Sequence, residues 1–332
     1  MKPEFDFFGD KISEKIVFFK LPINIGEIIA AYSSLKDNDK PLAREKIISN
    51  KIKIYTPTVI ICIFVVLILK QDLWWMFICL SIIVIVTLMI EGELNIFFHQ
   101  SFFVGTKGFA QFEISDFKKN ITKQIEINFE EVSDLFVEQT DVYDSDYYQE
   151  TLYKYVFFKK EPDYITSDPS FKSAKKLTNL KRTEVFLKEG NYDKEDKIKD
   201  LTKELIFCRK IEKYWTKYLI DSIDGKLKKD GYLLFRLYFG FYTDDFIKLG
   251  VDGITFMKTS LFNSSYEEFT YSYKDIKQLY IKNNFLYIEH SNFERKFYFI
   301  KSGNSDQINL MLLCDRSFFF KALQRLSGFK FD

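Results

Sequence analysis

Few residues in this sequence have the types and spacing that catalysis requires. The 332-residue chain holds only two histidines, His99 and His290, and neither has a second histidine or a cysteine pair at metal-ligand spacing near it. Each lies in a run that predicts a β-strand, so we interpret both as strand residues. Phosphate-loop, serine-hydrolase and zinc-peptidase motifs do not occur in the sequence. We therefore expect no catalytic residue, no metal and no cofactor.

A cluster of carboxylates is the first candidate for binding chemistry. Asp141, Asp144, Asp146 and Glu150 lie close together in the sequence and could supply hard oxygen ligands to a cation. The cluster lacks the glycine and the distal glutamate of an EF-hand loop. We favour the alternative, a solvated hairpin tip.

A basic stretch is the second candidate, and it lies in a polar insertion that runs from Glu161 to Arg182. Cations close to an anionic membrane each gain on the order of 1 kcal/mol. An ordinary solvated loop is the alternative interpretation. The possible lipid-contact residues are Lys172, Lys175, Lys176, Lys181 and Arg182.

The composition excludes one class of partner and favours one kind of structure. Lysine plus arginine (48) nearly balance aspartate plus glutamate (47), so no overall field would attract nucleic acid. Aromatic residues make up 18% of the chain, which favours packed β-structure over disorder. The four cysteines show neither a disulfide framework nor metal-ligand spacing.

Two uncharged apolar runs, residues 54–69 and 73–90, predict a transmembrane helical hairpin. Each run approaches the roughly 17 to 25 residues that cross a bilayer, and a three-residue turn separates them. Flanking lysines and tryptophans suit the membrane interface. These membrane-interface residues are Lys53, Lys70, Trp74 and Trp75.

Cationic residues before the first run outnumber the single Lys70 in the turn, which predicts that both termini are cytoplasmic. The expected location is thus the cell (inner) membrane, as a multi-pass protein. A buried hairpin inside a soluble core is the alternative.

Helical spacing also occurs before the apolar runs. Phe8, Ile12, Ile16 and Phe19 predict a short amphipathic helix that Pro22 ends. This helix would lie in the membrane interface or pack against the soluble part. A second helix is expected from Gly26 to Leu35, and a third from Pro41.

The remaining sequence predicts antiparallel sheets and two helices. Short runs between residues 94 and 187, and again between 232 and 300, have strand character, several of them with alternating apolar residues. Apolar residues at intervals of three or four predict a long helix from Asp193 to Ile223, with Trp215 on its buried face. A last helix is expected from Asp306 to Leu326, capped by Asn304 or Ser305 and closed by Gly328.

The two halves of this part match residue by residue, which predicts an internal duplication. Val104, Gly105, Gly108 and Phe109 correspond to Leu249, Gly250, Gly253 and Ile254. The segment FEEVSDLFV, which begins at Phe129, corresponds to YKDIKQLYI, which begins at Tyr273.

These features resemble a known fold and a known layout. The phrases VGTKGF…NFEEVSDL and LGVDGI…SYKDIKQLYI, with about seven strands and one C-terminal helix, are similar to the bacterial pleckstrin-homology-like fold. The layout of IGEIIAAY (residues 25–32), an apolar hairpin and two modules resembles an uncharacterised family of membrane proteins with tandem modules of this kind. The chain departs from that pattern in the insertion at 161–182 and in having Phe129 and Tyr273 where a tryptophan is frequent.

The expected fold class is therefore a membrane-anchored α+β protein with two pleckstrin-homology-like β-barrel or sheet modules, each closed by a C-terminal helix. The expected divisions are N-terminal cytoplasmic helices (1–50), a transmembrane hairpin (51–92), a first module with a long C-terminal helix (93–228) and a second module (229–332). The resemblance implies no known activity.

Three hypotheses for function follow. The leading one is a non-enzymatic, membrane-anchored scaffold or sensor that binds a protein partner, or another copy of itself, at the cytoplasmic face. The second is recognition of anionic membrane lipids, and the third is an unrecognised enzyme. Nucleic acid is not an expected partner.

Overall fold

The structure is a computed structural model of the chain. It describes residues 3–35, 55–61, 81, 83, 98–115, 121–160, 183–198, 200–238, 242–259, 266–290 and 305–330. The chain divides into two compact units. Unit 1 comprises Met1–Ile23, Ile28–Phe103 and Ala110–Glu126, and unit 2 comprises Asn24–Glu27, Val104–Phe109 and Ile127–Asp332.

Four strands form the first sheet, in the order β1-β2-β3-β4. They are β1 (Ile28–Ser33), β2 (Phe98–Gly105), β3 (Gly108–Ser115) and β4 (Ile121–Asn128). In unit 1 the rings of Phe103 and Phe112 pack edge to face with centroids 5.8 Å apart. Phe18, from the segment before β1, adds a third ring at 5.2 Å from Phe103. Aromatic packing therefore covers this sheet, as the aromatic-rich composition favours.

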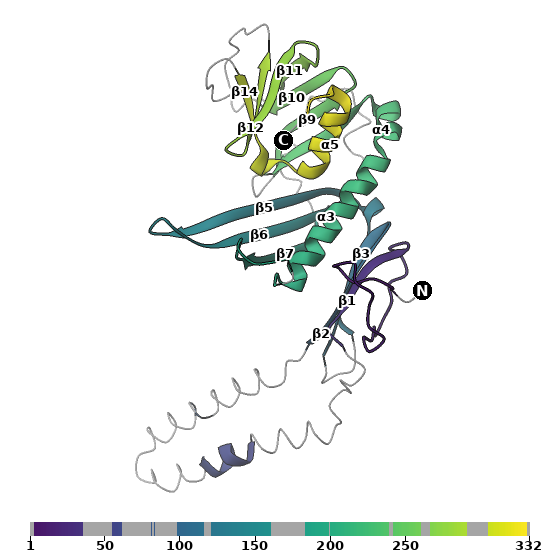
Figure 1. Cartoon of the computed structure of the whole chain (residues 1–332), viewed down its shortest axis with the longest axis vertical. Coiled ribbons are helices and arrows are strands. Elements are labelled where there is room, and N and C mark those ends of the chain that lie inside the picture. Colours follow the sequence, from purple (N-terminus) through teal and green to yellow (C-terminus); the bar gives the residue numbers. More distant parts are fainter. Residues whose placement is uncertain are drawn as a thin grey trace. The chain divides into compact units, whose positions relative to one another are not determined.

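A second, three-stranded sheet contains a long hairpin (Figure 1). After the 3₁₀ turn η1 (Phe129–Glu131), strands β5 (Val132–Asp144), β6 (Tyr147–Lys159) and β7 (Glu184–Tyr192) pair in the order β5-β6-β7. The hairpin turn consists of Ser145 and Asp146, which both have positive φ (48° and 70°). Two such residues form the tight turn whose twist matches that of paired strands.

Helix α3 (Lys203–Asp221) covers one face of this sheet. It begins where Thr202 Oγ1 accepts a hydrogen bond from the Leu205 amide at 3.3 Å, and the short helix α4 (Ile223–Asp230) follows it. Phe186 on β7 packs against Phe207 on α3 at 6.2 Å between centroids, and Phe157 on β6 packs against Trp215 at 6.4 Å. These rings are buried and form the core of unit 2.

The second half of the chain has the same element order. Strands β8 (Tyr232–Tyr238), β9 (Tyr242–Gly250), β10 (Gly253–Thr259) and β11 (Tyr266–Ser272) form a four-stranded sheet. Strands β12 (Ile276–Lys282), β13 (Phe285–His290) and β14 (Ser305–Asn309) form a three-stranded sheet. The 3₁₀ turn η3 (Leu310–Leu312) leads to helix α5 (Arg316–Ser327), which packs Phe319 on Phe235 of β8 at 5.0 Å.

Equivalent glycines in the two halves each allow a backbone carbonyl group of a neighbouring strand to approach closely. A Cβ atom on Gly108 would lie 2.2 Å from the Ile127 carbonyl oxygen, and one on Gly253 would lie 2.3 Å from that of Tyr271. The neighbouring hydrogen bonds also correspond, since Phe129 N donates to Lys107 O and Tyr273 N donates to Asp252 O. These contacts and the repeated element order agree with the predicted duplication.

Most of the predicted strands are confirmed. The predictions for β3 and β13 are correct at both ends. The other described strands that were predicted agree within four residues at each end, except that β7 extends five residues beyond the predicted Leu187. The predicted strand at 295–300 lies outside the described residues.

The predicted transmembrane hairpin is corrected. No helix among the residues that the structure describes is long and apolar enough to cross a membrane. Within the two apolar runs the described residues are 55–61, 81 and 83, all of them helical. The finding contradicts the membrane-anchored fold class and the multi-pass inner-membrane location. The remainder of both runs, including Lys53, Lys70, Trp74 and Trp75, lies outside the described residues.

The predicted closed barrels are also corrected. The described strands form four separate antiparallel sheets of three or four strands each, and none of these sheets closes on itself. In both halves the chain leaves the four-stranded sheet through a turn, η1 or residues 273–275, before it starts the three-stranded one.

Four predicted helices differ from the structure. Residues 3–27 form turns, with Phe18 and Phe19 packed on sheet rings, and Gly26–Leu35 contains strand β1. The long helix begins at Lys203, where Thr202 is the N-cap residue. Farther upstream, the Asp193 carboxylate accepts the Glu195 amide in a turn. The last helix begins at Arg316, after β14, and Gly328 closes it as predicted with φ 76°.

The glycine contacts give a first prediction. Gly108→Ala and Gly253→Ala should each lower the free energy of unfolding by about 1–3 kcal/mol, since a methyl group at either position meets a backbone oxygen. Gly225→Ala in α4 is the matched control, because nothing lies within 4 Å of its added Cβ. It should raise stability by about 0.5–1 kcal/mol. Chemical denaturation of the purified chain measures all three, and equal effects would contradict the proposed role.

Candidate functional site

The structure places only some of the residues that the sequence singled out. The five cations of the basic stretch lie in 161–182, outside the described residues. His99 lies on β2 and His290 is the last residue of β13, so both are strand residues as predicted.

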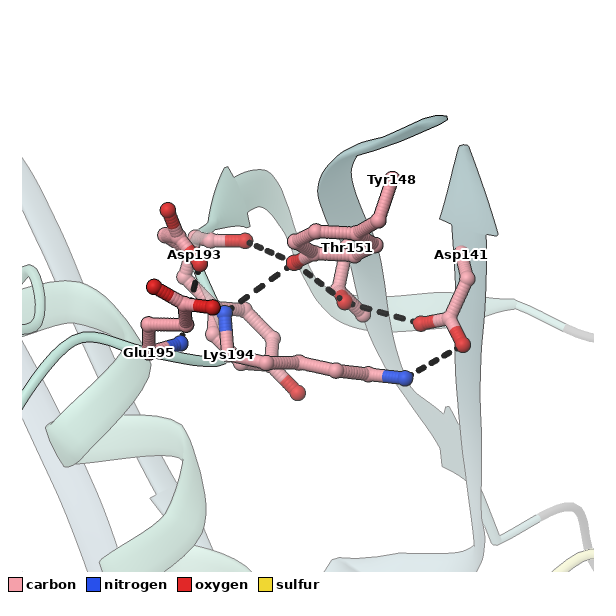
Figure 2. Close-up of polar contacts among 7 residues, drawn as sticks. Asp141, Tyr148, Thr151, Asp193, Lys194 and Glu195 are labelled. Carbon is pink, nitrogen blue, oxygen red and sulfur yellow. Dashed lines mark hydrogen bonds and ion pairs between the residues drawn. The ribbon is translucent and has the colours of Figure 1, made fainter. Parts of the chain in front are cut away.

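The acidic cluster is divided among separate hydrogen bonds around the β5–β6 hairpin. Asp141 forms an ion pair with Lys194 and accepts a hydrogen bond from Thr151 Oγ1 at 2.8 Å (Figure 2). Glu150 accepts a hydrogen bond from the side-chain Nδ2 of Asn191, and Asp144 accepts one from Ser145 Oγ at 3.2 Å. No group of three metal-ligating side chains occurs within the described ranges.

The Asp141 side chain belongs to a polar cluster that ties the hairpin to the segment before α3. The Tyr148 hydroxyl accepts a hydrogen bond from the Lys194 amide at 3.0 Å and lies 3.0 Å from Thr151 Oγ1 (Figure 2). The hydrogen bonds from Lys194 and Thr151 lower the pKa of Asp141, and Asp141 in turn raises the pKa of Lys194. Both charges are therefore present at neutral pH and neutralise each other.

Backbone groups of β5 alternate between the sheet and its open edge. Leu135 N donates to Asp315 Oδ1 at 3.0 Å, and Leu135 O accepts from Asp315 N at 2.7 Å, so the backbone of Leu135 points away from β6. The register between β5 and β6 is regular from Leu135 to Val142. The backbone N–H and C=O groups of every second residue along β5 therefore point outward, as those of Leu135 do. Those residues are Val137, Gln139 and Asp141.

A groove of about 190 Å³ lies beside this part of β5. It is called the edge groove below. Its lining includes Val137, Glu138, Gln139 and Asp141 of β5, together with Thr151 and Lys194. The lining also includes Asn284, Met311 and Arg316 from the second half of the chain.

The edge groove contains four charged residues, of which Lys194 and Asp141 form an ion pair. Glu138 has no ion pair with another described residue. Among the residues that the structure describes, Arg316 has no ion pair, and its side chain is half-buried. The groove thus combines unpaired main-chain groups with one cation and one anion that have no ion pair among the described residues.

Next to the edge groove, a buried carboxylate links three elements. Asp315, which precedes α5, accepts hydrogen bonds on Oδ1 from Trp215 Nε1 at 2.7 Å and from Leu135 N at 3.0 Å. It has a left-handed backbone with φ 52°. Burial, and then the nearby charge of Asp134, raise the pKa of Asp315 to about 7. These bonds fix α5 to α3 and β5.

Further charged residues lie around the place where α5, α3 and β5 meet, which is called the junction below. Asp134 is almost fully buried and forms an ion pair with Arg236 of β8 at 3.3 Å. Burial lowers the pKa of Lys226 on α4, whereas the charges of Asp315 and Asp134 act to raise it. The junction therefore contains opposite charges from both halves of the chain, all within unit 2.

The comparisons with known proteins identify no family. Neither a family model nor a curated protein matches the chain. The resemblance to pleckstrin-homology-like modules therefore stays a prediction.

Sequence reasoning missed Asp315, Arg316 and the edge of β5. Asp315 lies inside the predicted last helix, and an aspartate at such a position is predicted to be exposed to solvent. Its partner Trp215 was correctly predicted to be buried, with 1% of its surface exposed, but the hydrogen bond of its indole was not. A buried tryptophan usually needs a hydrogen-bond acceptor, and this was the one available signal.

Trp215 gives a second prediction. Trp215→Ala should lower the free energy of unfolding by about 3–5 kcal/mol through the lost ring packing. Trp215→Phe keeps a ring but leaves Asp315 without its indole donor, and should cost about 1–3 kcal/mol. Lys213→Ala, exposed on the same helix, serves as the control and should change stability by less than about 0.5 kcal/mol. A Trp215→Ala chain that unfolds like the control would show that the junction does not stabilise the fold.

Asp315 gives a third prediction, on pH dependence. Its pKa is raised in the folded chain, so folding binds a proton between about pH 4 and about pH 7. The stability that this proton contributes is present below that window and is lost as pH rises through about 7. Asp315→Asn cannot ionise, so the stability of the native chain minus that of the variant should fall as pH rises from 5 to 8. Denaturation at several pH values measures the difference, and a constant difference would exclude this titration.

Proposed function

We propose that the chain is a non-enzymatic scaffold that binds a protein partner through its β5–β6–β7 sheet. The observation that carries the proposal is the exposure of large apolar side chains on that sheet. Tyr147 and Tyr143 at the hairpin end are 76% and 59% exposed, and Leu152 and Leu187 are 44% and 43% exposed. Tyrosine and other large apolar residues concentrate in protein interfaces. These four residues are called the hairpin surface below.

The base of the hairpin is held rigidly, which lowers the entropic cost of binding. Tyr238 of β8 packs on Phe136 at 4.7 Å and on Phe158 at 5.1 Å between ring centroids. Helix α3 covers the other face through Phe207 and Trp215. The free end of the hairpin is thus presented on a fixed support.

The repeated element order supports the proposed pleckstrin-homology-like modules. Each half has four strands in one sheet, three in the next and then a helix. Lipid recognition rests on the basic stretch at 161–182, and no observation on the described residues favours it.

Affinity capture with matched variants tests the proposal. The tagged full-length chain should retain a partner that a variant of the hairpin surface (Tyr143→Ser, Tyr147→Ser, Leu152→Thr, Leu187→Thr) loses by at least about tenfold, since these side chains would be buried in the interface. The control variant changes Val251 and Ile281 to threonine, because these are similarly exposed apolar residues of the second half (61% and 44%).

Quantitative mass spectrometry after cross-linking measures the retained protein, and a second copy of the chain counts as a partner. The control should retain what the native chain retains. The proposal fails if the native chain captures nothing above background, or if both variants capture equally.

A further inference from the structure

We propose that the Asp315 carboxyl group is a proton-controlled switch between the two halves of unit 2. Its neutral form holds the second half (β8 to α5) against the first half (β5 to α4), and its ionised form lets this contact open. The inference goes beyond the proposed function, because it concerns how the two halves hold together and not what the hairpin surface binds.

A short segment of the second half forms the contact that the switch controls. Cys314 N donates to Arg236 O of β8 at 2.9 Å, and Asp315 N donates to Leu135 O of β5 at 2.7 Å. The Asp315 side chain returns to the same residue of β5, since Oδ1 accepts from Leu135 N at 3.0 Å. The segment therefore joins an edge strand of each half, and Asp315 provides its link to β5.

Two carboxyl groups from different halves face each other at this contact. Asp134 precedes Leu135 on β5, is almost fully buried and forms an ion pair with Arg236 at 3.3 Å. Its charge acts on Asp315 across the junction. An ionised Asp315 places a second negative charge beside Asp134 where little water screens it. The repulsion acts between the halves, because each carboxylate belongs to a different one.

The hydrogen bonds of Asp315 suit its neutral form. Trp215 Nε1 and Leu135 N both donate to Oδ1, and no donor among the described residues reaches Oδ2. A proton on Oδ2 therefore leaves both bonds intact, since Oδ1 is the acceptor in either form. Asp315 keeps 9% of its surface exposed, so its proton can exchange with solvent.

Cations on three elements lie around Asp315. Lys226 on α4 interacts with the Asp315 charge and favours the ionised form. Arg236 on β8 is paired with Asp134, and Arg316, the next residue on α5, lines the edge groove. Lys226 is therefore the cation that opposes the neutral form.

The remaining charges decide the balance. On α3 the Glu212 carboxylate accepts a hydrogen bond from Ser317 Oγ, two residues after Asp315. Burial and the charge of Asp134 outweigh the charge of Lys226, and raise the pKa of Asp315 to about 7. The carboxyl group therefore changes its charge near neutral pH.

A rise in pH favours the open contact. Asp315 binds its proton more tightly when it is buried than when it is exposed, so opening releases a proton between about pH 4 and about pH 7. The opening constant therefore rises by up to about tenfold for each step of one in pH across this window, and it is constant above the window.

The second half keeps its own packing when the contact opens. Helix α5 stays on β8, because the ring of Phe319 lies 5.0 Å from that of Phe235 within the second half. The contact of Tyr238 with Phe136 and Phe158 joins the halves and opens together with the Asp315 bonds. The switch therefore predicts a local opening that leaves the sheets of both halves intact.

Amide hydrogen exchange of the full-length chain tests the switch, because exchange detects rare local openings. After correction for the intrinsic exchange rate, the opening constant of the amides of residues 135 and 315 should rise at least about tenfold from pH 5.5 to pH 8. Asp315→Asn keeps the Oδ1 acceptor but cannot ionise, so its opening constant should change less than about twofold. Equal pH dependence in the two chains overturns the inference.

A comparison with global unfolding distinguishes the switch from a general effect of pH. At pH 8 the same two amides should exchange at least about tenfold faster than the unfolding constant from chemical denaturation allows. Phe157 on the central strand β6 is the control, and its amide should exchange only at the rate that global unfolding permits. If the two amides exchange no faster than Phe157, the contact opens only when the chain unfolds, and there is no switch.

Two charge variants test which groups set the switch, and they replace Asp315→Asn if that variant does not fold. Asp134→Asn removes the facing carboxylate and should lower the pH at which opening becomes constant by about 0.5–1. Lys226→Gln removes the facing cation and should raise that pH by a similar amount. Lys229→Gln, exposed on the same helix, is the control and should not shift it. Absence of these two opposite shifts overturns the inference.

Discussion

The rest of unit 2 depends on the buried carboxylate of Asp315. A buried carboxyl group is costly unless hydrogen bonds compensate it, and here Trp215 Nε1 and Leu135 N both donate to the same oxygen. These donors belong to a helix and a strand of the first half, whereas Asp315 starts the last helix of the second half. Moving any of the three elements would leave a buried polar group unsatisfied. The junction therefore fixes where β5 lies with respect to α5.

That constraint decides which part of the long hairpin remains available. Near the junction, Tyr238 covers one face of the sheet and Trp215 covers the other. Farther along β5 the side chains become exposed, and Tyr143 is 59% accessible. The same strand is thus core at one end and surface at the other. The backbone of β5 is paired with Asp315 at Leu135, and from Val137 onward its outward groups have no backbone partner among the described residues. The edge groove therefore begins where the core ends.

Local sequence signals predicted most strands and the buried face of α3, because alternation and glycine placement depend on near neighbours. These local signals failed where contacts with residues distant in the sequence determine the structure of a segment. The segment Ile28–Ser33 is short and apolar, so its period suits a helix or a strand equally, and the pairing of β1 with β2 decided it. The rings of Phe18 and Phe19 have helical spacing yet pack individually on sheet residues. The edge groove was beyond prediction, since Arg316 and Val137 are far apart in the sequence and no pattern joins them.

The duplication explains why the groove is found at the first copy. β12 corresponds to β5 and is likewise the edge strand of its three-stranded sheet. A copied strand edge, however, becomes a groove only when a following element supplies a wall and a residue like Asp315. For β5, that element is the segment from η3 to the start of α5, which belongs to the second copy. β12 is also shorter, with 7 residues against 13 in β5. The edge groove is therefore a composite feature of the two halves, because its lining residues come from both of them.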